Sequence, residues 1–235
     1  MHAERRRLLL QGAADAGLDA VAVVPGPNLL YLTGLGFHLS ERPVILFLAP
    51  GADAHIVLPA LEAPKVAGAD FSLRAFDYDD DAGPARAVAA ALEALGLPGR
   101  RCGVEDRRMR FLEMDLMARS RVGPDLLGAD QVFARLRARK DDAEIAAMER
   151  AVAVAEEALG AVLPEIRAGL TERDIASRLT AALLVAGSDP QLPFFPIVAA
   201  GPNGALPHAL PTDRPLAGGD FVVVDWGARY GGYCS

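Results

Sequence analysis

The sequence predicts an α/β domain, with one sheet flanked by helices, followed by a second domain of different texture. In the first part of the chain, short apolar runs alternate with helical patterns, which is typical of α/β domains. Near residue 136 a basic connector passes into a strong amphipathic helix, and proline and glycine punctuate much of the chain beyond it. We therefore predict one domain over residues 1–135 and a second over residues 136–235.

The predicted elements of the first domain come from hydrophobic periodicity. Four apolar runs indicate strands: residues 19–24, 44–49, 55–60 and 72–78. Three segments with helical spacing lie between and around them: residues 3–16, 84–96 and 109–119.

A long helix is expected to open the second domain. Asp141, with Glu144 three residues later, forms a capping-box pattern in which Asp replaces the usual Ser or Thr. Four apolar residues at helical spacing predict the buried face of this helix: Ile145, Met148, Val152 and Leu159.

A second helix follows in the segment that begins LTERD. Thr171 is its predicted cap and Gly187 its left-handed stop. Its predicted apolar face consists of Ile175, Leu179, Leu183 and Ala186. The proline- and glycine-rich segment after it is expected to form short strands and shaped loops.

Composition excludes several classes of function. The net charge of −7 and the pI near 5.1 argue against a nucleic-acid partner, because phosphate binding requires clustered Lys and Arg. The short basic runs 5–7, 107–108 and 135–140 are interpreted as solvated helix faces or a linker. No stretch approaches the ~20 apolar residues of a membrane span, so no membrane association is expected.

The two cysteines, Cys102 and Cys234, lie far apart and outside any CxxC or Cys/His pattern. They indicate neither a disulfide framework nor a metal site, and a reducing compartment fits them. We therefore expect a cytoplasmic protein.

Asp225 is the first candidate site residue. It directly follows the apolar run 221–224, which is typical of a strand covered on both faces. A carboxylate at such a position is costly unless it meets a cation, so its partner is Arg229, a helix terminus or a metal ion. The local pattern fits a strand-end residue paired with Arg229 as well as it fits a ligand.

The glycine pair 231–232 predicts a turn in the segment after Asp225. The chain from Tyr233 onward is then expected to return as a hairpin beside the apolar strand, which places the residue after Ser235 near Asp225. Two carboxylates on adjacent strands are suited to holding a pair of divalent ions.

His208 is the second candidate site residue. It lies in a loop braced by Pro207 and Pro211, where a neutral imidazole is able to orient or protonate a polar substrate group near pH 7. A lone histidine is more often structural, and only this setting distinguishes His208 from His2, His38 and His55. The glycines of residues 34–40 lack dinucleotide-binding spacing, so we discount that segment as a cofactor loop.

Several of these segments, in this order, resemble the creatinase/prolidase group of M24 metallopeptidases, which includes Xaa-Pro aminopeptidases, Xaa-Pro dipeptidases and creatinase. The segment GLDAVAVVPGPNLLYLTG resembles the N-terminal domain signature of the group. RLRARKDDAEIAAMERAVAVAEEAL resembles its entry into the catalytic domain, and FPIVAAGPNGALPHALPTDRPLAGGDFVVVDWGARYGGYCS resembles the first part of the active-site half.

The resemblance implies a creatinase-like α/β N-terminal domain followed by an α+β pita-bread catalytic domain with two metal ions, usually Mn, Co or Zn. Asp225 matches the first metal ligand of the group. His208 matches the histidine that contacts substrate and helps to stabilise the tetrahedral intermediate. The resemblance further implies a proline-containing peptide substrate and a homodimer.

The later ligands of the group, an Asp directly after GYCS, a His and two Glu, do not occur in these 235 residues. We therefore expect an incomplete pita-bread domain, a C-terminally truncated chain that holds no metal stably, and no activity from the chain as given. We expect the coding sequence to continue past Ser235 with that Asp. The alternatives are a creatinase-like, metal-free amidinohydrolase and a noncatalytic peptide-binding pita-bread module.

Overall fold

A six-stranded mixed sheet forms the centre of the first of two units in the computed structural model, which describes residues 1–97, 99–120 and 123–235. The units are Met1–Arg139 and Lys140–Ser235. The sheet order is β4-β3-β2-β1-β5-β6, and β2 runs antiparallel to both of its neighbours while the other pairs are parallel. Its strands are β1 (Ala20–Val23), β2 (Ile45–Leu48), β3 (Ala54–Pro59), β4 (Leu73–Tyr78), β5 (Arg101–Val104) and β6 (Asp125–Gly128).

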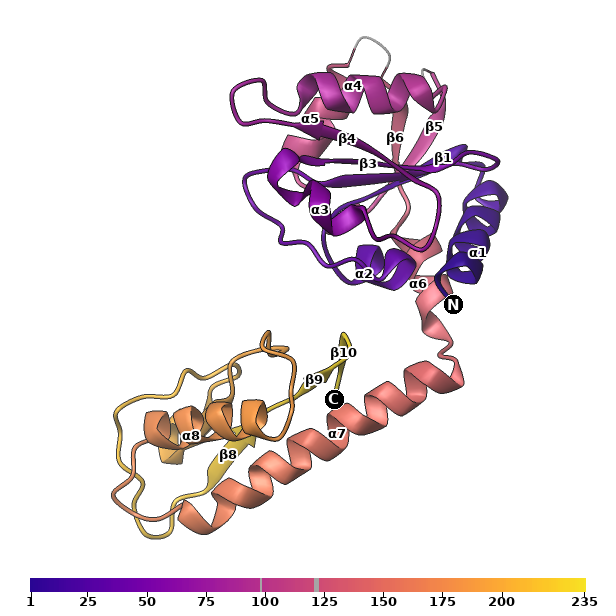
Figure 1. Cartoon of the computed structure of the whole chain (residues 1–235). Coiled ribbons are helices and arrows are strands. Elements are labelled where there is room, and N and C mark those ends of the chain that lie inside the picture. The colour runs from indigo at the N-terminus through magenta and orange to yellow at the C-terminus, as the bar shows by residue number, and fades with distance from the viewer. Residues whose placement is uncertain (98, 121–122) are drawn as a thin grey trace. The chain divides into compact units, whose positions relative to one another are not determined.

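Helices cover both faces of this sheet, as Figure 1 shows for α4 and α2. One face packs against α4 and α5, and the other against α1, α2 and α6. Every residue of β1, β2 and β3 is buried, because side chains that alternate across the sheet meet a helix layer on each side. The helices of the unit are α1 (His2–Asp15), α2 (Pro27–Thr33), α3 (Ala63–Val66), α4 (Ala85–Ala94), α5 (Phe111–Ala118) and α6 (Asp130–Ala138), with a 3-10 turn at Ala60–Glu62.

The four predicted strands and three predicted helices of this unit are confirmed, with small differences at their ends. The sequence patterns did not reveal α2, α3, α6 or the strands β5 and β6. β5 begins with an arginine and contains Gly103, where a Cβ atom would lie 2.7 Å from the Leu18 side chain and 2.8 Å from that of Ala129. Close packing of this strand therefore requires a residue that weakens its apolar pattern.

The prediction that the first basic run is a solvated helix face is wrong for Arg5. Arg5 is only 6% exposed, and its guanidinium lies 3.9 Å from the centre of the Tyr31 ring and donates a hydrogen bond to the Tyr31 carbonyl. Arg6 donates to the Leu32 carbonyl at 2.8 Å, whereas Arg7 is exposed and pairs with Glu4. Two of the three arginines thus bind carbonyls of the last turn of α2, where a cation is favourable.

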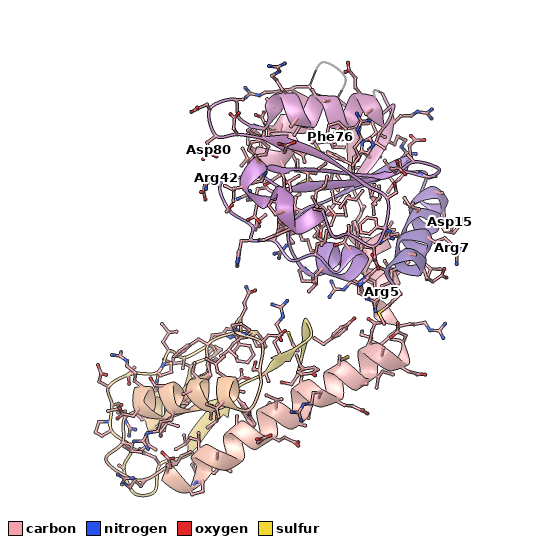
Figure 2. All side chains as sticks on the ribbon, in the orientation of Figure 1. Arg5, Arg7, Asp15, Arg42, Phe76 and Asp80 are labelled. Atoms are coloured by element: carbon pink, nitrogen blue, oxygen red, sulfur yellow. The ribbon has the colours of Figure 1, made fainter. Side chains whose placement is uncertain are left out.

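The glycine-containing segment 34–40 begins with the residue that ends helix α2. Gly34, with φ of 74°, is the left-handed cap of α2. Beyond the segment, Arg42 forms a two-bond ion pair with Asp80 at 2.7 and 2.6 Å, and the two residues lie together in Figure 2. Gly34, at the start of the segment, is therefore explained by its role as the cap of α2.

In the second unit, two helices pack on each other and on one face of a two-stranded sheet (Figure 1). β7 and β8 pair antiparallel, and β9 and β10 form a separate hairpin. The helices are α7 (Asp142–Val162) and α8 (Glu172–Val185), and the strands are β7 (Ile197–Ala200), β8 (Val222–Asp225), β9 (Arg229–Tyr230) and β10 (Tyr233–Cys234), with 3-10 turns at Leu163–Glu165 and Gly201–Ala205.

The predicted helix starts of this unit are confirmed. Asp141 accepts a hydrogen bond from the Glu144 amide at 2.9 Å, and the Glu144 side chain accepts from the Asp141 amide. Thr171 and Asp174 form the same reciprocal pair at the start of α8. Both boxes satisfy amides that have no partner within the helix.

The predicted apolar face of α7 is wrong for Ile145 and Val152, whereas Leu159 packs against the core. Ile145 and Val152 are 44% and 43% exposed. The buried apolar residues of the helix are instead mostly small, which allows the close approach of α8: Ala151, Val154, Ala155, Ala158 and Val162. Apolar spacing identified an amphipathic helix, but the size of the side chains that fit against α8 decided which stripe is inside.

Among the described residues, no helix combines the length and the apolarity that crossing a bilayer requires.

His55 gives the first unit a testable pH dependence. The side chain is 4% exposed, its ring packs at 4.9 Å from that of Phe76, and Nδ1 lies 3.2 Å from the Ala91 carbonyl. Burial lowers the pKa of His55 below its ordinary value. The unfolded chain therefore binds a proton more readily, and stability is lost as the pH falls through about 6.5.

We expect His55→Phe to remove this part of the pH dependence, which is at most about 1.4 kcal/mol per pH unit. The Ala91 carbonyl keeps its helical bond from the Leu95 amide, so the variant leaves no unpaired acceptor there. Urea unfolding between pH 7.5 and 5.5 measures the difference between the two slopes. Equal slopes for wild type and variant would contradict the prediction.

Candidate functional site

Asp225 is the last residue of β8 and lies opposite Ile197 of β7. Its side chain is exposed, and among the described residues it has no hydrogen-bond or ion-pair partner. The interpretation of Asp225 as a residue paired with Arg229 is wrong. Arg229 instead lies 3.8 Å from Asp189 and donates to Gln191 at 3.2 Å, so the Asp225 carboxylate remains open to a ligand.

The expectation that the strand before Asp225 is covered on both faces is also wrong for the described residues. Val222 and Val224 pack into the helical core, and Trp226 donates to the Ala155 carbonyl at 2.9 Å. Because side chains alternate along a strand, the intervening residues turn to the opposite face. That face is exposed and carries Phe221 at 91% and Val223 at 47% exposure, with Asp225 at its end.

The predicted glycine turn is confirmed. The chain after the turn pairs with β9, however, and not with the apolar strand β8 as predicted. Gly231 and Gly232 have φ of 56° and 86°, which suits a two-residue hairpin turn. Tyr233 returns opposite Tyr230, so the hairpin pairs β10 with β9, while the partner of β8 is β7. The Gly232 amide donates to Asp189 at 3.0 Å, which anchors the turn to the segment after α8.

His208 lies at an exposed position of the loop between β7 and β8. Among the described residues it is the only one other than glycine with positive φ, at 57°. This left-handed conformation is sparsely populated by residues with a Cβ atom, and the surrounding structure must maintain it. Its neighbour Ala209 is buried at 4% exposure, which anchors the chain beside the exposed imidazole.

The loop of His208 begins on the same face of the β7–β8 sheet as Asp225. A Cβ atom placed at Gly204, in the 3-10 turn that opens the loop, would lie 3.4 Å from Cγ2 of Val223. Val223 and Asp225 share a strand face because they are two residues apart. The loop that carries His208 thus starts on the face that carries Asp225, and no hydrogen bond or ion pair joins the two residues among the described residues.

Glu172 is a residue of this site that the sequence patterns missed. It is the first residue of α8 and its side chain is fully buried. Its carboxylate accepts hydrogen bonds from the Ala200 amide, the Asn203 side chain, and both the amide and the hydroxyl of Thr212. A glutamate in the first turn of a helix is ordinarily an exposed residue favoured by the helix dipole, so nothing local in the sequence distinguishes it.

The described residues do not by themselves fit a two-metal centre. No three His, Cys, Asp or Glu side chains gather among them in a way that holds a metal ion. Each divalent ion needs several ligands and a bridging group, which one carboxylate does not supply. The exposed Asp225 carboxylate is thus outside any group of three such side chains among the described residues.

Comparisons with known proteins match both units. Residues 5–139 match the Creatinase/Prolidase N-terminal domain, and residues 146–235 match Metallopeptidase family M24. "Probable dipeptidase PepE" of Mycobacterium bovis is 35% identical over 239 residues, which cover 100% of this chain and 62% of that protein. The Xaa-Pro dipeptidase of Pyrococcus horikoshii is 26% identical over 233 residues, which cover 99% and 62%.

A solved structure agrees with these matches. The crystal structure of a dipeptidase from Pyrococcus horikoshii OT3 has a TM-score of 0.88 and 32% identity, over 98% of this chain and 63% of that one. The chain thus spans less than two thirds of the length of the relatives that it matches.

The left-handed conformation of His208 predicts how substitutions there change stability. We expect His208→Val to lower the free energy of unfolding by about 1–2 kcal/mol, because a β-branched side chain is strained at positive φ. His208→Asn is the matched control and is expected to stay within about 0.5 kcal/mol of wild type, since Asn tolerates this region. Denaturant unfolding measures both, and equal stabilities for the two variants would refute the assigned conformation.

Proposed function

Because the chain belongs to metallopeptidase family M24 and carries a creatinase/prolidase N-terminal domain, we propose that it forms part of a metal-dependent peptidase that hydrolyses Xaa-Pro dipeptides. The 35% identity to a protein named as a dipeptidase, over the whole of this chain, supports the peptidase class. The Xaa-Pro dipeptidase among the relatives supports the bond before proline as the target.

The family and fold class predicted from the sequence are confirmed. The chain consists of a creatinase-type N-terminal domain, with a mixed sheet flanked by helices, and an M24 pita-bread domain. The match to a metallopeptidase family implies the use of divalent metal ions.

In this proposal Asp225 contributes one carboxylate to the metal centre, with Mn, Co or Zn as the metal. The observation that carries the proposal is that Asp225 ends a well-paired strand with its carboxylate free of any described partner. An exposed carboxylate with no described partner is accessible to a metal ion supplied with ligands from elsewhere. The remaining ligands would lie in the part of the relatives' length that this chain does not span.

His208 acts in this proposal on the substrate. A neutral imidazole held in a rigid loop is able to donate a hydrogen bond to the oxygen that becomes negative as the peptide bond is attacked. The exposed position of His208, on a loop that begins on the face of Asp225, supports this role.

The test compares the protein at the full length of its coding sequence with residues 1–235 alone. We expect the full-length protein to hydrolyse Xaa-Pro dipeptides when Mn, Co or Zn is added, and the 235-residue chain to show no turnover, because it supplies one of several ligands. Longer Xaa-Pro peptides assayed in parallel distinguish an aminopeptidase from a dipeptidase. Absence of metal-dependent turnover from the full-length protein would contradict the proposal, and metal-independent hydrolysis of creatine would favour the creatinase-like alternative.

Two substitutions in the full-length protein test the assigned roles. Asp225→Asn is expected to lower kcat/KM at least about 100-fold with reduced metal content, since an amide is a poorer ligand than a carboxylate. His208→Ala is expected to lower kcat about 100- to 1000-fold with metal content unchanged. Glu157→Gln, an exposed position on α7, is the control and should leave both quantities unchanged. Full activity of Asp225→Asn would sink its assignment as a ligand.

A further inference from the structure

The two ends of the His208 loop meet on one buried carboxylate. Oε1 of Glu172 accepts from the amide of Ala200, where the loop begins, at 2.7 Å. Oε2 accepts from the amide and the hydroxyl of Thr212, where the loop ends, at 2.9 and 2.7 Å. The intervening residues 201–211 therefore have both ends fixed to the first turn of α8.

A side chain inside the loop, that of Asn203, adds a further hydrogen bond to Glu172. The Asn203 side-chain amide donates to Oε2 of Glu172 at 2.8 Å and lies 3.3 Å from the Leu210 carbonyl. Asn203 thus links the outgoing half of the loop to the returning half, five positions before His208 on the chain. A backbone bond from the Arg173 amide to the Thr212 carbonyl, at 3.1 Å, adds a further tie at the returning end.

The charge of Glu172 strengthens these contacts. Burial opposes ionisation of this side chain, but the hydrogen bonds from Thr212, Ala200 and Asn203 outweigh it and hold the pKa of Glu172 below its ordinary value. Hydrogen bonds to an ionised acceptor are shorter and stronger than neutral ones. An uncharged replacement weakens all of them together.

This arrangement explains how an exposed histidine keeps a left-handed backbone. A residue at positive φ reverts to a commoner conformation unless its neighbours hold it, and His208 is itself exposed. The constraint must come from the rest of the loop, whose two ends and Asn203 side chain all converge on Glu172.

We propose that Glu172 is the positioning residue of His208. Glu172 does not touch the substrate, but its hydrogen bonds with Ala200, Asn203 and Thr212, here called the clamp, hold the loop in the conformation that directs the imidazole to the substrate. This inference rests on the proposed function only for what His208 does there. The clamp itself concerns the loop and is measurable without catalysis.

The first experiment measures the loop in the 235-residue chain. Glu172→Gln is expected to speed hydrogen exchange of the Ala200 and Thr212 amides at least about tenfold and to lower the order parameter of the His208 amide. Leu183→Ala, in the core of the same unit, is the control for general destabilisation and should leave the order parameter of His208 unchanged. Should Glu172→Gln fail to fold, Asn203→Ala removes a single donor and is expected to change the same amides less. An unchanged order parameter of His208 in both Glu172→Gln and Asn203→Ala would overturn the proposal.

The second experiment is a double-mutant cycle in the full-length protein. Glu172→Gln is expected to lower kcat about 10- to 100-fold, because a misplaced catalytic group loses most of its effect. The double variant Glu172→Gln/His208→Ala should then lose no more than His208→Ala alone, since Glu172 acts through His208. Additive losses would show that Glu172 acts elsewhere and would overturn the positioning role.

These outcomes separate the inference from the proposed function. If the full-length protein does not hydrolyse Xaa-Pro dipeptides, the proposed function fails. Amide hydrogen exchange and the order parameter of His208 still show whether Glu172 holds the loop. If the protein hydrolyses them while Glu172→Gln retains full kcat, the function stands and the positioning role fails.

Discussion

A carboxylate withdrawn from water must be met by hydrogen-bond donors, and each unit of this chain contains a glutamate that is met in the same manner. Glu105, at 1% exposure, accepts from the Val24 amide at 2.7 Å and from the Asn28 side chain at 2.8 Å. Glu172, fully buried, accepts from the Ala200 amide and the Asn203 side chain, and also from Thr212. In both units a buried carboxylate joins the end of a β-strand to an asparagine shortly after it.

Desolvation and hydrogen bonding shift the pKa values of the two carboxylates in opposite directions. Burial raises the pKa of Glu105, because two hydrogen bonds do not compensate for its desolvation. Burial acts in the same direction on Glu172, but the hydrogen bonds from Thr212, Ala200 and Asn203 together outweigh it and lower the pKa of Glu172. The hydrogen bonds to Glu172 thus favour its ionised form, which strengthens a contact that holds both ends of a loop.

The alternation of side chains along β8 explains why Asp225 is exposed. Val222, Val224 and Trp226 turn into the core against α7 and α8, so the residues between them are directed to the opposite face. A period of two residues therefore separates the part of β8 that stabilises the unit from the part that carries the candidate ligand. The apolar run of β8 alone does not show this, because valine occupies positions on both faces.

Local patterns in the sequence determined much of this protein: the strands β1 to β4, the capping box at Asp141, the cap at Thr171, the glycine turn, and the motifs that identify the family. These features depend on residues close together on the chain, whose propensities and hydrogen bonds act locally. The tertiary structure alone decided that α7 buries its small residues, that Arg229 turns to Asp189 and leaves Asp225 open, and that Arg5 is buried against Tyr31. It also decided the role of Glu172, because the donors that surround this carboxylate come from positions 28 to 40 residues away and meet only when the chain is folded.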